Sequence, residues 1–504
     1  MASVNYGVCD GCRARVPTEH VIRRGKVYLR KNCPDCGPNE ALISADAAAW
    51  QRKRELCHFD PDAPLFCTLR CETCRHNHKP RMVFMDVTNR CNMNCPICIA
   101  NIPGMGFEFH PPLSYFEKVL SGLARLNPKP VVQLFGGEPT MRKDLFEIIE
   151  LGRSKGLDLR IVTNGLRLAD EDYCRRICDS KVHVLIAFDG RDPGIYERLR
   201  KNPGAYEKKV KALENLRKFS RHRNTIMCCV ARKINDRHMR DLIDFCHESR
   251  DFIKCLHLIP LTETWEEGEF EAEISTTTED VEQIIDEAFP EGRVEFLPMG
   301  PSAALRLPLL FFGAVPLKFG GVHPNCETAT YLISDGNQFW PLSRYLKRPL
   351  DEIAEEVVSL SERLEPELSR LDPQKWLDRK RGQVKVLRAF LPLLFRSLNF
   401  RQLFGKDPWW AGLCVVGGLL IGRKLKQQVR KHSTVRDAML MVVLPFEEAH
   451  SVEAARLQEC PSAFVYEEPE TGEVKTMPVC VWGLYKNEIQ RKIAEKYAAS
   501  SVAK

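Results

Sequence analysis

The sequence lacks the features that mark membrane-spanning, secreted and nucleic-acid-binding proteins. No apolar run reaches the ~20 residues that cross a bilayer. The closest, residues 409–422, has fourteen and is typical of a buried or interfacial helix. Residues 1–12 contain no apolar stretch like that of a signal peptide. A net charge of +7 over 504 residues is too small to indicate nucleic-acid binding. We therefore expect a cytoplasmic protein, either free or peripheral on the inner face of the membrane.

Cysteine is the residue type present in excess. The chain has 21 cysteines, and eleven of them precede residue 99. Disulfide-rich proteins are usually short and secreted, whereas closely spaced cysteines in a long cytosolic chain are typical of metal sites. Two C-x2-C pairs, Cys9/Cys12 and Cys33/Cys36, are separated by twenty residues. This spacing predicts one tetrahedral site with four thiolate ligands, for either a structural zinc or a rubredoxin-like mononuclear iron.

The middle of the chain alternates short apolar runs with amphipathic helical stretches. Such alternation predicts an α/β fold, in which a buried parallel sheet is covered by helices. Ligands are then expected at the carboxyl ends of the strands. The six predicted strands are residues 81–88, 131–135, 157–165, 182–190, 225–232 and 253–260.

The chain divides into four regions by composition. Residues 1–60 form the four-cysteine module, 61–80 hold a second cysteine cluster, 81–290 contain the βα array and 291–504 form a mixed α/β extension. Within these regions, residues 276–289 begin like a capped helix. We expect residues 290–345 to be irregular, 350–435 to be helical and 436–504 to be mixed.

A third cysteine motif follows the first predicted strand. Cys91, Cys95 and Cys98 have the spacing C-x3-C-x2-C, and no fourth cysteine lies at a matching distance. Three thiolates can hold three irons of a [4Fe–4S] cluster and leave the fourth iron open. The next predicted strand ends in residues 136–140 (GGEPT), where paired glycines permit close backbone approach and Glu138 can hold an ammonium group. Either motif alone could be a zinc site or a turn, but their occurrence at consecutive strand ends favours a cofactor site.

These residues resemble the radical S-adenosylmethionine (SAM) superfamily, over roughly residues 81–260. The resemblance implies a partial (β/α)6 barrel in which SAM binds the open iron. An electron from a low-potential donor, such as ferredoxin or flavodoxin, then cleaves SAM to a 5′-deoxyadenosyl radical that abstracts a hydrogen atom. The residues that the resemblance places against SAM are Gly136, Gly137, Glu138, Pro139, Asn164 and Asp189.

Further cysteines predict additional metal centres. Cys67, Cys71 and Cys74 repeat the C-x3-C-x2-C spacing without a GGE-like element of their own, so we interpret them as ligands of an auxiliary [4Fe–4S] cluster, with Cys57 as a candidate fourth ligand. Three later cysteines are candidates for another cluster: Cys326, Cys460 and Cys480. The remaining seven cysteines lie in apolar segments, and most of them are expected in the core: Cys174, Cys178, Cys228, Cys229, Cys246, Cys255 and Cys414.

The order of the motifs over nearly the whole chain resembles the radical SAM family that includes tetraether synthase and the 7,8-dihydro-6-hydroxymethylpterin methyltransferase. The resemblance implies an enzyme that functionalises unactivated carbon. Residues 387–404 and 409–422 interleave apolar and aromatic residues and precede the basic run 423–431. This arrangement suits interfacial helices on anionic lipid or, equally, a buried helical lid. We favour carbon–carbon coupling of lipid chains. The alternatives are methyl transfer to a pterin and a non-catalytic iron–sulfur or zinc scaffold.

Overall fold

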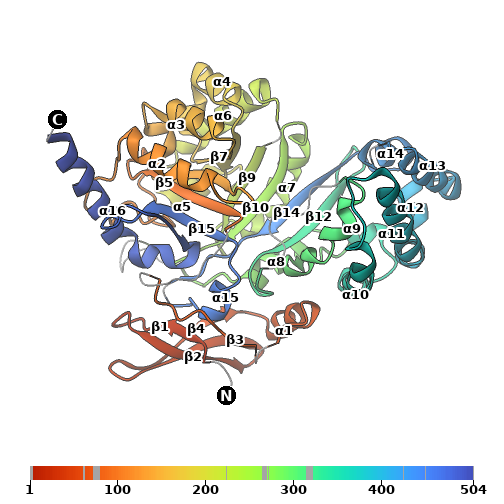
Figure 1. Ribbon diagram of the computed structural model, residues 1–504, viewed down its shortest axis with the longest axis horizontal. Coiled ribbons are helices and arrows are strands. Elements are labelled where there is room, and N and C mark those ends of the chain that lie inside the picture. The colour runs from red at the N-terminus through yellow and green to blue at the C-terminus, as the bar shows by residue number, and fades with distance from the viewer. Residues whose placement is uncertain are drawn as a thin grey trace.

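The computed structural model describes residues 4–60, 63–71, 80–222, 224–263, 270, 272–313, 322–423, 425–448 and 450–502. These residues form a four-stranded sheet at the N-terminus, a twelve-stranded sheet in the body of the molecule and a helical arm (Figure 1). The four-cysteine module lies below the large sheet in this view, and the C-terminal helix lies at the end of the molecule opposite the arm.

The N-terminal module is an antiparallel sheet followed by one helix. Its strands pair in chain order: β1 (Tyr6–Val8), β2 (Arg15–Arg23), β3 (Lys26–Cys33) and β4 (Gly37–Ser44). Helix α1 (Ala47–Leu56) begins where the Asp46 carboxylate accepts hydrogen bonds from the N–H groups of Ala48 and Ala49. Lys53 of α1 is buried and contacts two carboxylates of α8 (Thr278–Glu287), Glu279 at 2.8 Å and Glu282 at 2.9 Å. This ion pair joins the module to the body of the molecule.

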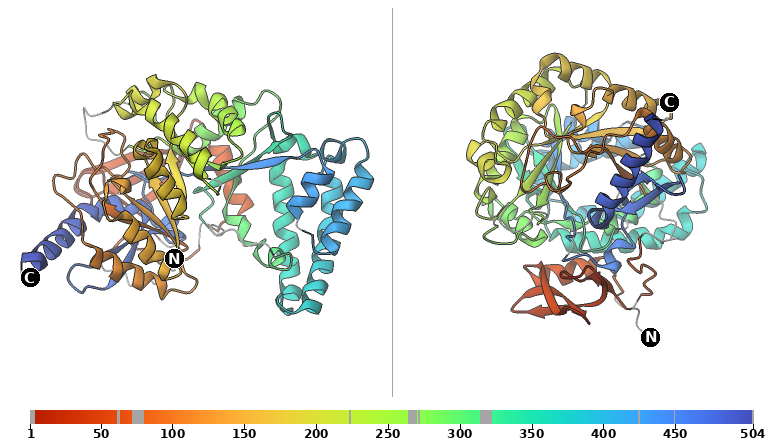
Figure 2. Two further views of the ribbon diagram at one scale, coloured as in Figure 1. Left: turned by 90° about the horizontal axis from the view of Figure 1, so that it is seen from above. Right: turned by 90° about the vertical axis from the view of Figure 1, so that its left-hand side faces the viewer.

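All six predicted strands of the middle region are confirmed, and they lie side by side and parallel. They are β5 (Met82–Thr88), β6 (Val131–Gly136), β7 (Asp158–Thr163), β8 (His183–Ala187), β9 (Asn224–Val230) and β10 (Ile253–Pro260). The helices between them pack around the outside of the curved sheet (Figure 2, right). These helices are α2 (Leu113–Ala124), α3 (Leu145–Ser154), α4 (Glu171–Asp179), α5 (Pro193–Arg200), α6 (Ala205–Phe219) and α7 (Met239–Glu248).

The two faces of this sheet differ in exposure. Ile226 of β9 and Leu256 of β10 pair in register and are fully buried, whereas their neighbours Met227 and His257, also paired, are only half-buried. Side chains alternate between the faces of a strand, so the helix-covered face is sealed and the inner face is partly open. Any substrate must therefore approach the strands from the inner side.

The C-terminal region extends both edges of the same sheet, so residue 290 is not a structural boundary. At one edge, β14 (Asp437–Val443) runs parallel to β10, and β12 (Thr328–Ser334) runs antiparallel to β14. At the other edge, β15 (Ser462–Glu467) runs parallel to β5, and β16 (Val474–Pro478) pairs with β15. The short strands β11 (Leu297–Pro298) and β13 (Phe339–Pro341) pair with β12.

The expectation that residues 290–345 are irregular is therefore wrong in part. Strand β12 was missed because its long pairing partner is β14, residues 437–443, which lies far along the chain; the nearby partner β13 has only three residues. Helix α9 (Arg306–Leu310) also lies in this region. In contrast, the capped helix predicted from residues 276–289 is α8, where Thr277 and Asp280 form a complete capping box.

Residues 350–435 are helical as predicted and form the arm: α10 (Leu350–Leu368), α11 (Trp376–Ser397), α12 (Phe400–Phe404), α13 (Pro408–Leu420) and α14 (Leu425–His432). The tail is mixed as predicted and also contains α15 (Ala454–Leu457) and α16 (Val479–Val502). Within the described part of the chain, none of the helices is both long and apolar enough to cross a membrane. Helix α13 is not buried at its start, because Trp409 and Trp410 are 69% and 71% exposed.

Candidate functional site

The two motifs predicted separately at consecutive strand ends are bonded to each other. The N–H of Gly137 donates to the carbonyl of Thr88 at 2.6 Å, and the N–H of Glu138 donates to the carbonyl of Arg90 at 2.8 Å. A Cβ atom on Gly137 would lie 2.4 Å from the Arg90 carbonyl oxygen, so only glycine permits this approach. Gly136 has a φ of +123° and is similarly close to Thr88. The glycines therefore lock the end of β6 to the loop that carries Cys91.

The cysteine loop is also held from its other side. The Asn89 side-chain oxygen accepts a hydrogen bond from the Phe109 N–H at 2.8 Å, which closes the loop. Arg142 is buried and donates to the carbonyls of Val87 at 2.8 Å and Pro111 at 3.0 Å. Lys486 of the C-terminal helix α16 donates to the Ala100 carbonyl at 2.8 Å. These bonds fix the position of the three thiols before any ligand binds.

Cys91, Cys95 and Cys98 are half-buried and electrostatically coupled. The pKa of Cys91 is raised to about 12, mainly by burial. The charges of Glu138, Cys98 and Cys95 add to this rise, and an N–H···S bond from Met93 opposes it. Burial also raises the pKa of Cys95. Thiolates that are costly in this environment become stable when they bind a metal. Three converging, partly desolvated thiols therefore fit a [4Fe–4S] cluster with one open iron.

Glu138 connects the ends of two strands. Its carboxylate is 1% exposed and accepts hydrogen bonds from the Thr140 hydroxyl at 2.6 Å, the Thr163 hydroxyl at 2.7 Å and the Asn164 N–H at 2.7 Å. A contact with the SAM ammonium group stays a prediction for this residue. The structure adds that Glu138 holds the GGEPT turn against the end of β7.

The two predicted ribose contacts have different surroundings. The Asn164 amide donates to Asn92 at 2.7 Å and to the Cys91 sulfur at 3.9 Å, so it faces the cysteine loop. Asp189 is fully buried and forms two hydrogen bonds of 2.9 Å with Arg200. Burial opposes ionisation, but the charge of Arg200 holds the pKa of Asp189 below its usual value. Asp189 therefore orients Arg200, and its contact with SAM is untested.

Two basic residues beside this site were not predicted from the sequence. Arg200, at the end of α5, is attracted to Cys95 and Cys229. Lys209 of α6 donates to the carbonyls of Asn164 and Ala187 at 2.6 Å each, and burial lowers its pKa to about 8. Both cations offset the negative charge of a thiolate cluster. No pattern distinguished them from the other basic residues of amphipathic helices.

The four-cysteine site forms as predicted. The sulfur atoms of Cys9, Cys12, Cys33 and Cys36 all lie within 4.8 Å of one another. The backbone N–H of Cys12, among other N–H and S–H donors, lowers the pKa of Cys9 to about 7, because it hydrogen-bonds the thiolate. This geometry fits a tetrahedral metal ion. Zinc and iron share this ligand set, so both remain open.

Three cysteines that are far apart in the sequence lie near enough to interact electrostatically. Cys326 precedes β12, Cys460 precedes β15 and Cys480 lies in the first turn of α16. The N–H of Glu447, beyond β14, donates to the Cys480 sulfur at 3.3 Å. Burial raises the pKa of Cys326 to about 11 and of Cys460 to about 12, and a charge on Cys326 would further disfavour ionisation of Cys460 and Cys480. The buried guanidinium of Arg456 contacts this cluster of thiols.

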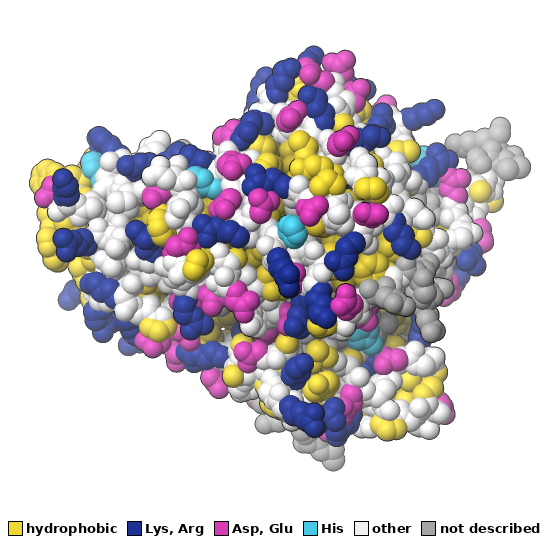
Figure 3. Space-filling view, turned by 180° about the vertical axis from the view of Figure 1, so that it is seen from behind, with side chains coloured by type: hydrophobic (Ala, Val, Ile, Leu, Met, Phe, Trp, Pro, Cys, Tyr) yellow, Lys and Arg dark blue, Asp and Glu magenta, His cyan; other side chains and the backbone are white. Residues whose placement is uncertain are grey.

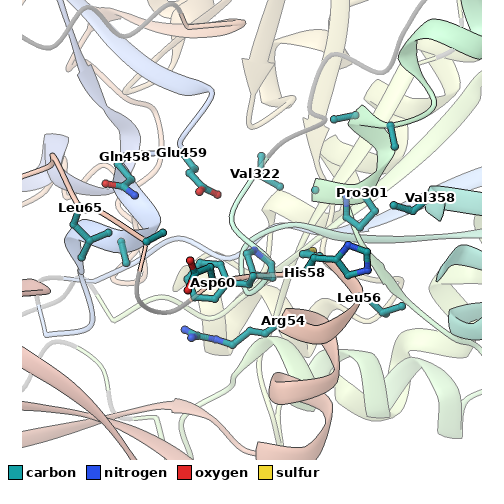
Figure 4. Close-up of a pocket in the computed structure, with 18 of the residues that line it drawn as sticks. Arg54, Leu56, His58, Asp60, Leu65, Pro301, Val322, Val358, Gln458 and Glu459 are labelled. Carbon is teal, nitrogen blue, oxygen red and sulfur yellow. The ribbon is translucent and has the colours of Figure 1, made fainter. Parts of the chain in front are cut away.

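The remaining predicted ligands are only partly described. Cys67 and Cys71 are half-buried, and Cys74 lies outside the described residues. Cys57 lines a cavity of about 630 Å³ between α1, the chain after it, the turn Gly300–Ala303 and the region of α15. Arg54, His58 and Asp60 enter this cavity from one side, and Gln458 and Glu459 from another (Figure 4). The ligand set of the first auxiliary cluster is therefore untested.

The seven cysteines expected in the core divide into two groups. Four are buried: Cys174, Cys228, Cys246 and Cys255. The other three are half-buried: Cys178, Cys229 and Cys414. Cys229 pairs in register with Ile259, on the partly open face of the sheet.

Two family models match parts of this chain. Residues 85–246 match the model of the radical SAM superfamily, and residues 3–45 match that of the HMPTM N-terminal zinc ribbon domain. A solved structure of histidine-tagged anSMEcpe with bound AdoMet covers 62% of this chain and 97% of its own, at 18% identity and a TM-score of 0.35.

The fold, the cysteine loop and the family matches define a radical SAM enzyme with an N-terminal four-cysteine module. The chain is 24% identical to the 7,8-dihydro-6-hydroxymethylpterin dimethyltransferase of Methanocaldococcus jannaschii, in an alignment that covers 98% of this chain and 96% of that protein. It is 29% identical to the AdoMet-dependent heme synthase of Methanosarcina barkeri over 28% of this chain and 40% of that enzyme.

Proposed function

We propose that this enzyme uses a cluster on Cys91, Cys95 and Cys98 to attach carbon to an unactivated carbon atom, and that methyl transfer to a pterin is its reaction. One observation carries the choice: the alignment with the pterin dimethyltransferase runs from the four-cysteine module to the tail. This reverses the order of preference drawn from the sequence, which put lipid-chain coupling first. The radical SAM match leaves the non-catalytic scaffold without support.

When bound, the cluster and SAM supply a 5′-deoxyadenosyl radical. The residues of this chain hold that chemistry in place. The GGEPT turn supports the cysteine loop through backbone hydrogen bonds, and Glu138 and Asn164 offer acceptors and donors beside Cys91. Arg200 and Lys209 place positive charge near Cys95, where it stabilises a negatively charged cluster or the carboxylate of SAM.

We also propose the remaining centres. Cys67, Cys71 and Cys74 would hold one auxiliary [4Fe–4S] cluster, with Cys57 as a candidate fourth ligand. Cys326, Cys460 and Cys480 would hold another, on the evidence of their convergence. A low-potential protein such as ferredoxin or flavodoxin would supply electrons. We propose a cytoplasmic location with peripheral membrane contact.

Lipid-chain coupling remains a second candidate because of the partly open face of the sheet. Near the carboxyl ends of the strands, this face presents mainly apolar, half-buried side chains: Phe135, Val162, Ala187, Met227, Cys229 and Ile259. A pterin carries many hydrogen-bonding groups, whereas a lipid chain needs only an apolar wall. The partly open face therefore favours an apolar substrate, whereas the alignment favours a pterin.

The test is anaerobic reconstitution of the full chain with iron and sulfide, followed by dithionite, SAM and 7,8-dihydro-6-hydroxymethylpterin. We expect 5′-deoxyadenosine and a methylated pterin, and neither product from Cys91→Ala. Lipids of an expressing host are analysed in parallel. Unchanged pterin together with lipid chains of doubled mass would overturn methyl transfer and support coupling. Intact SAM after reduction would overturn both reactions.

Metal analysis tests the centres separately. Cys91→Ala, Cys71→Ala, Cys460→Ala and Cys12→Ala should each lose one centre and keep the others, because the ligand sets share no residue. Unchanged iron and sulfide in Cys71→Ala or Cys460→Ala would exclude the corresponding auxiliary cluster.

A further inference from the structure

The helical arm concentrates the exposed apolar surface of the protein. Fifteen large hydrophobic side chains are exposed among the described residues, and nine of them lie between residues 376 and 421. Trp409, Trp410, Leu413 and Ile421 of α13 and the turn after it are 66–71% exposed. Monomeric soluble proteins rarely leave such groups uncovered together, so this surface indicates a binding site.

The exposed groups near the end of the arm form one ordered patch, which we call the aromatic tip. Phe395 of α11 stacks on Phe400 of α12 with ring centres 5.1 Å apart, and Trp409 of α13 stacks on Phe395 at 5.8 Å. Leu413 and Ile421 continue this surface along α13. Hydrophobic side chains gather at the end of the arm, with lysines and arginines around them (Figure 3, left edge). Because the stacked rings fix the patch, its exposure does not come from a loosely packed loop.

The residues around the aromatic tip carry mostly positive charge. Residues 379–436 contain fourteen lysines and arginines and one acidic residue, Asp407, a net charge of +13. Since the whole chain carries +7, the other residues are together net acidic. Arg401, Lys406 and Arg423 are exposed beside the aromatic tip. Residues 379–436 therefore carry a positive field that the whole-chain charge conceals. Helix α10 of the same arm is acidic, and its Glu367 and Glu356 pair with Lys385 and Arg396.

From this combination we propose that the aromatic tip binds the surface of an anionic phospholipid bilayer. Helix α13 has no charged residue between Pro408 and Leu420. A helix that is apolar all round is normally buried in protein or lipid, and this one is thirteen residues long, too short to cross a bilayer. Exposed tryptophans with flanking cations suit the headgroup region, where indole rings bury their apolar body and cations meet lipid phosphates.

The same observations argue against other occupants. A second copy of the chain would bring two surfaces of equal positive charge together, which repel each other. Nucleic acid would match the charge, but exposed aliphatic groups such as Leu413 and Ile421 contribute nothing to stacking on bases. The proposal holds whether the substrate is a pterin or a lipid, because it rests on the arm and not on the cluster site.

The experiment is flotation of the full, metal-loaded chain with phosphatidylcholine vesicles that contain or lack phosphatidylglycerol. We expect binding only to the anionic vesicles and a loss of binding as salt rises. Trp409→Ser with Trp410→Ser should weaken partition by about a hundredfold or more, because two indoles no longer leave water. Arg401→Gln with Lys406→Gln should weaken it by about fivefold for each charge removed.

Two controls keep the result interpretable. Ile22→Ser removes an apolar side chain that is 57% exposed on β2, far from the arm in sequence, and should bind like the wild type. Leu413→Ser removes an apolar group of the aromatic tip but no stacked ring, and it should also weaken binding. Equal binding of wild type and the tryptophan double variant, with circular dichroism and iron content unchanged, would overturn the proposal. The proposal would also be overturned if an RNA oligonucleotide displaced the protein from the vesicles. A third contrary result would be a wild-type dimer that is absent in the tryptophan double variant.

Discussion

A single added methyl group at Gly137 should separate the GGEPT turn from the loop that carries Cys91. In Gly137→Ala, the new Cβ would lie 2.4 Å from the Arg90 carbonyl oxygen, 2.8 Å from its carbon and 2.9 Å from the carbonyl carbon of Asn89. All three are backbone atoms, so no side-chain rotation relieves the contact. The end of β6 and the cysteine loop must move apart by about 1 Å to restore ordinary contact distances.

That movement breaks the bonds from Gly137 to Thr88 and from Glu138 to Arg90. A buried backbone group without a partner costs about 1–3 kcal/mol, so two broken bonds destabilise the locked loop by ~2–6 kcal/mol. We therefore expect Gly137→Ala to retain little iron after reconstitution and to make little 5′-deoxyadenosine. Iron content, product by chromatography and anaerobic thermal unfolding measure the three consequences.

The matched control is Gly417→Ala, in α13, where a Cβ would meet nothing within 4 Å. Alanine suits a helix better than glycine by up to ~1 kcal/mol, so this variant should keep wild-type iron and SAM cleavage. If Gly137→Ala bound iron and cleaved SAM as well as this control, the role assigned to the close backbone approach would be refuted.

Three further results are expected. Lys53→Met should cost about 3–5 kcal/mol in the free energy of unfolding, because it leaves two buried carboxylates without a cation, whereas Lys211→Met, in an exposed pair, should change it by less than ~1 kcal/mol. Burial, together with Lys254 and Arg160, lowers the pKa of His183 to about 3. Below pH ~6.5, His183 is therefore protonated in the unfolded state but stays neutral in the folded state. Urea titrations should then show wild-type stability falling, relative to His183→Gln, by about 1.4 kcal/mol per pH unit between pH 6 and 4, and parallel curves would contradict this. Cys12→Ala should lose the metal of the N-terminal module while the circular dichroism of the large sheet persists, and an unchanged metal content would contradict the four-cysteine site.

The six parallel strands were predictable because their signal is local. Each is a short apolar run between helical stretches, and burial on both faces makes that run nearly continuous in β5 and β6. Strand β12 gave no such signal, since residues 297–298, 339–341 and 437–443 supply its pairing partners. Arg200 and Lys209 were missed for a related reason. Their proximity to Cys95 depends on where α5 and α6 pack, not on their neighbours in sequence.

The sequence by itself determined the chemistry of this protein, because cysteine spacing decides which thiols can share a metal within one loop. The sequence alone grouped Cys91, Cys95 and Cys98 as ligands of one metal centre. It did the same for the two C-x2-C pairs, Cys9/Cys12 and Cys33/Cys36. Only the tertiary structure decided that Cys326, Cys460 and Cys480 lie near one another, because they belong to segments that are far apart in the sequence. It alone also decided that Trp409, Trp410 and Leu413 of the apolar helix α13 stay exposed while Val415 is buried. The sequence shows which residues are apolar, but the packing of distant elements decides which of them are buried.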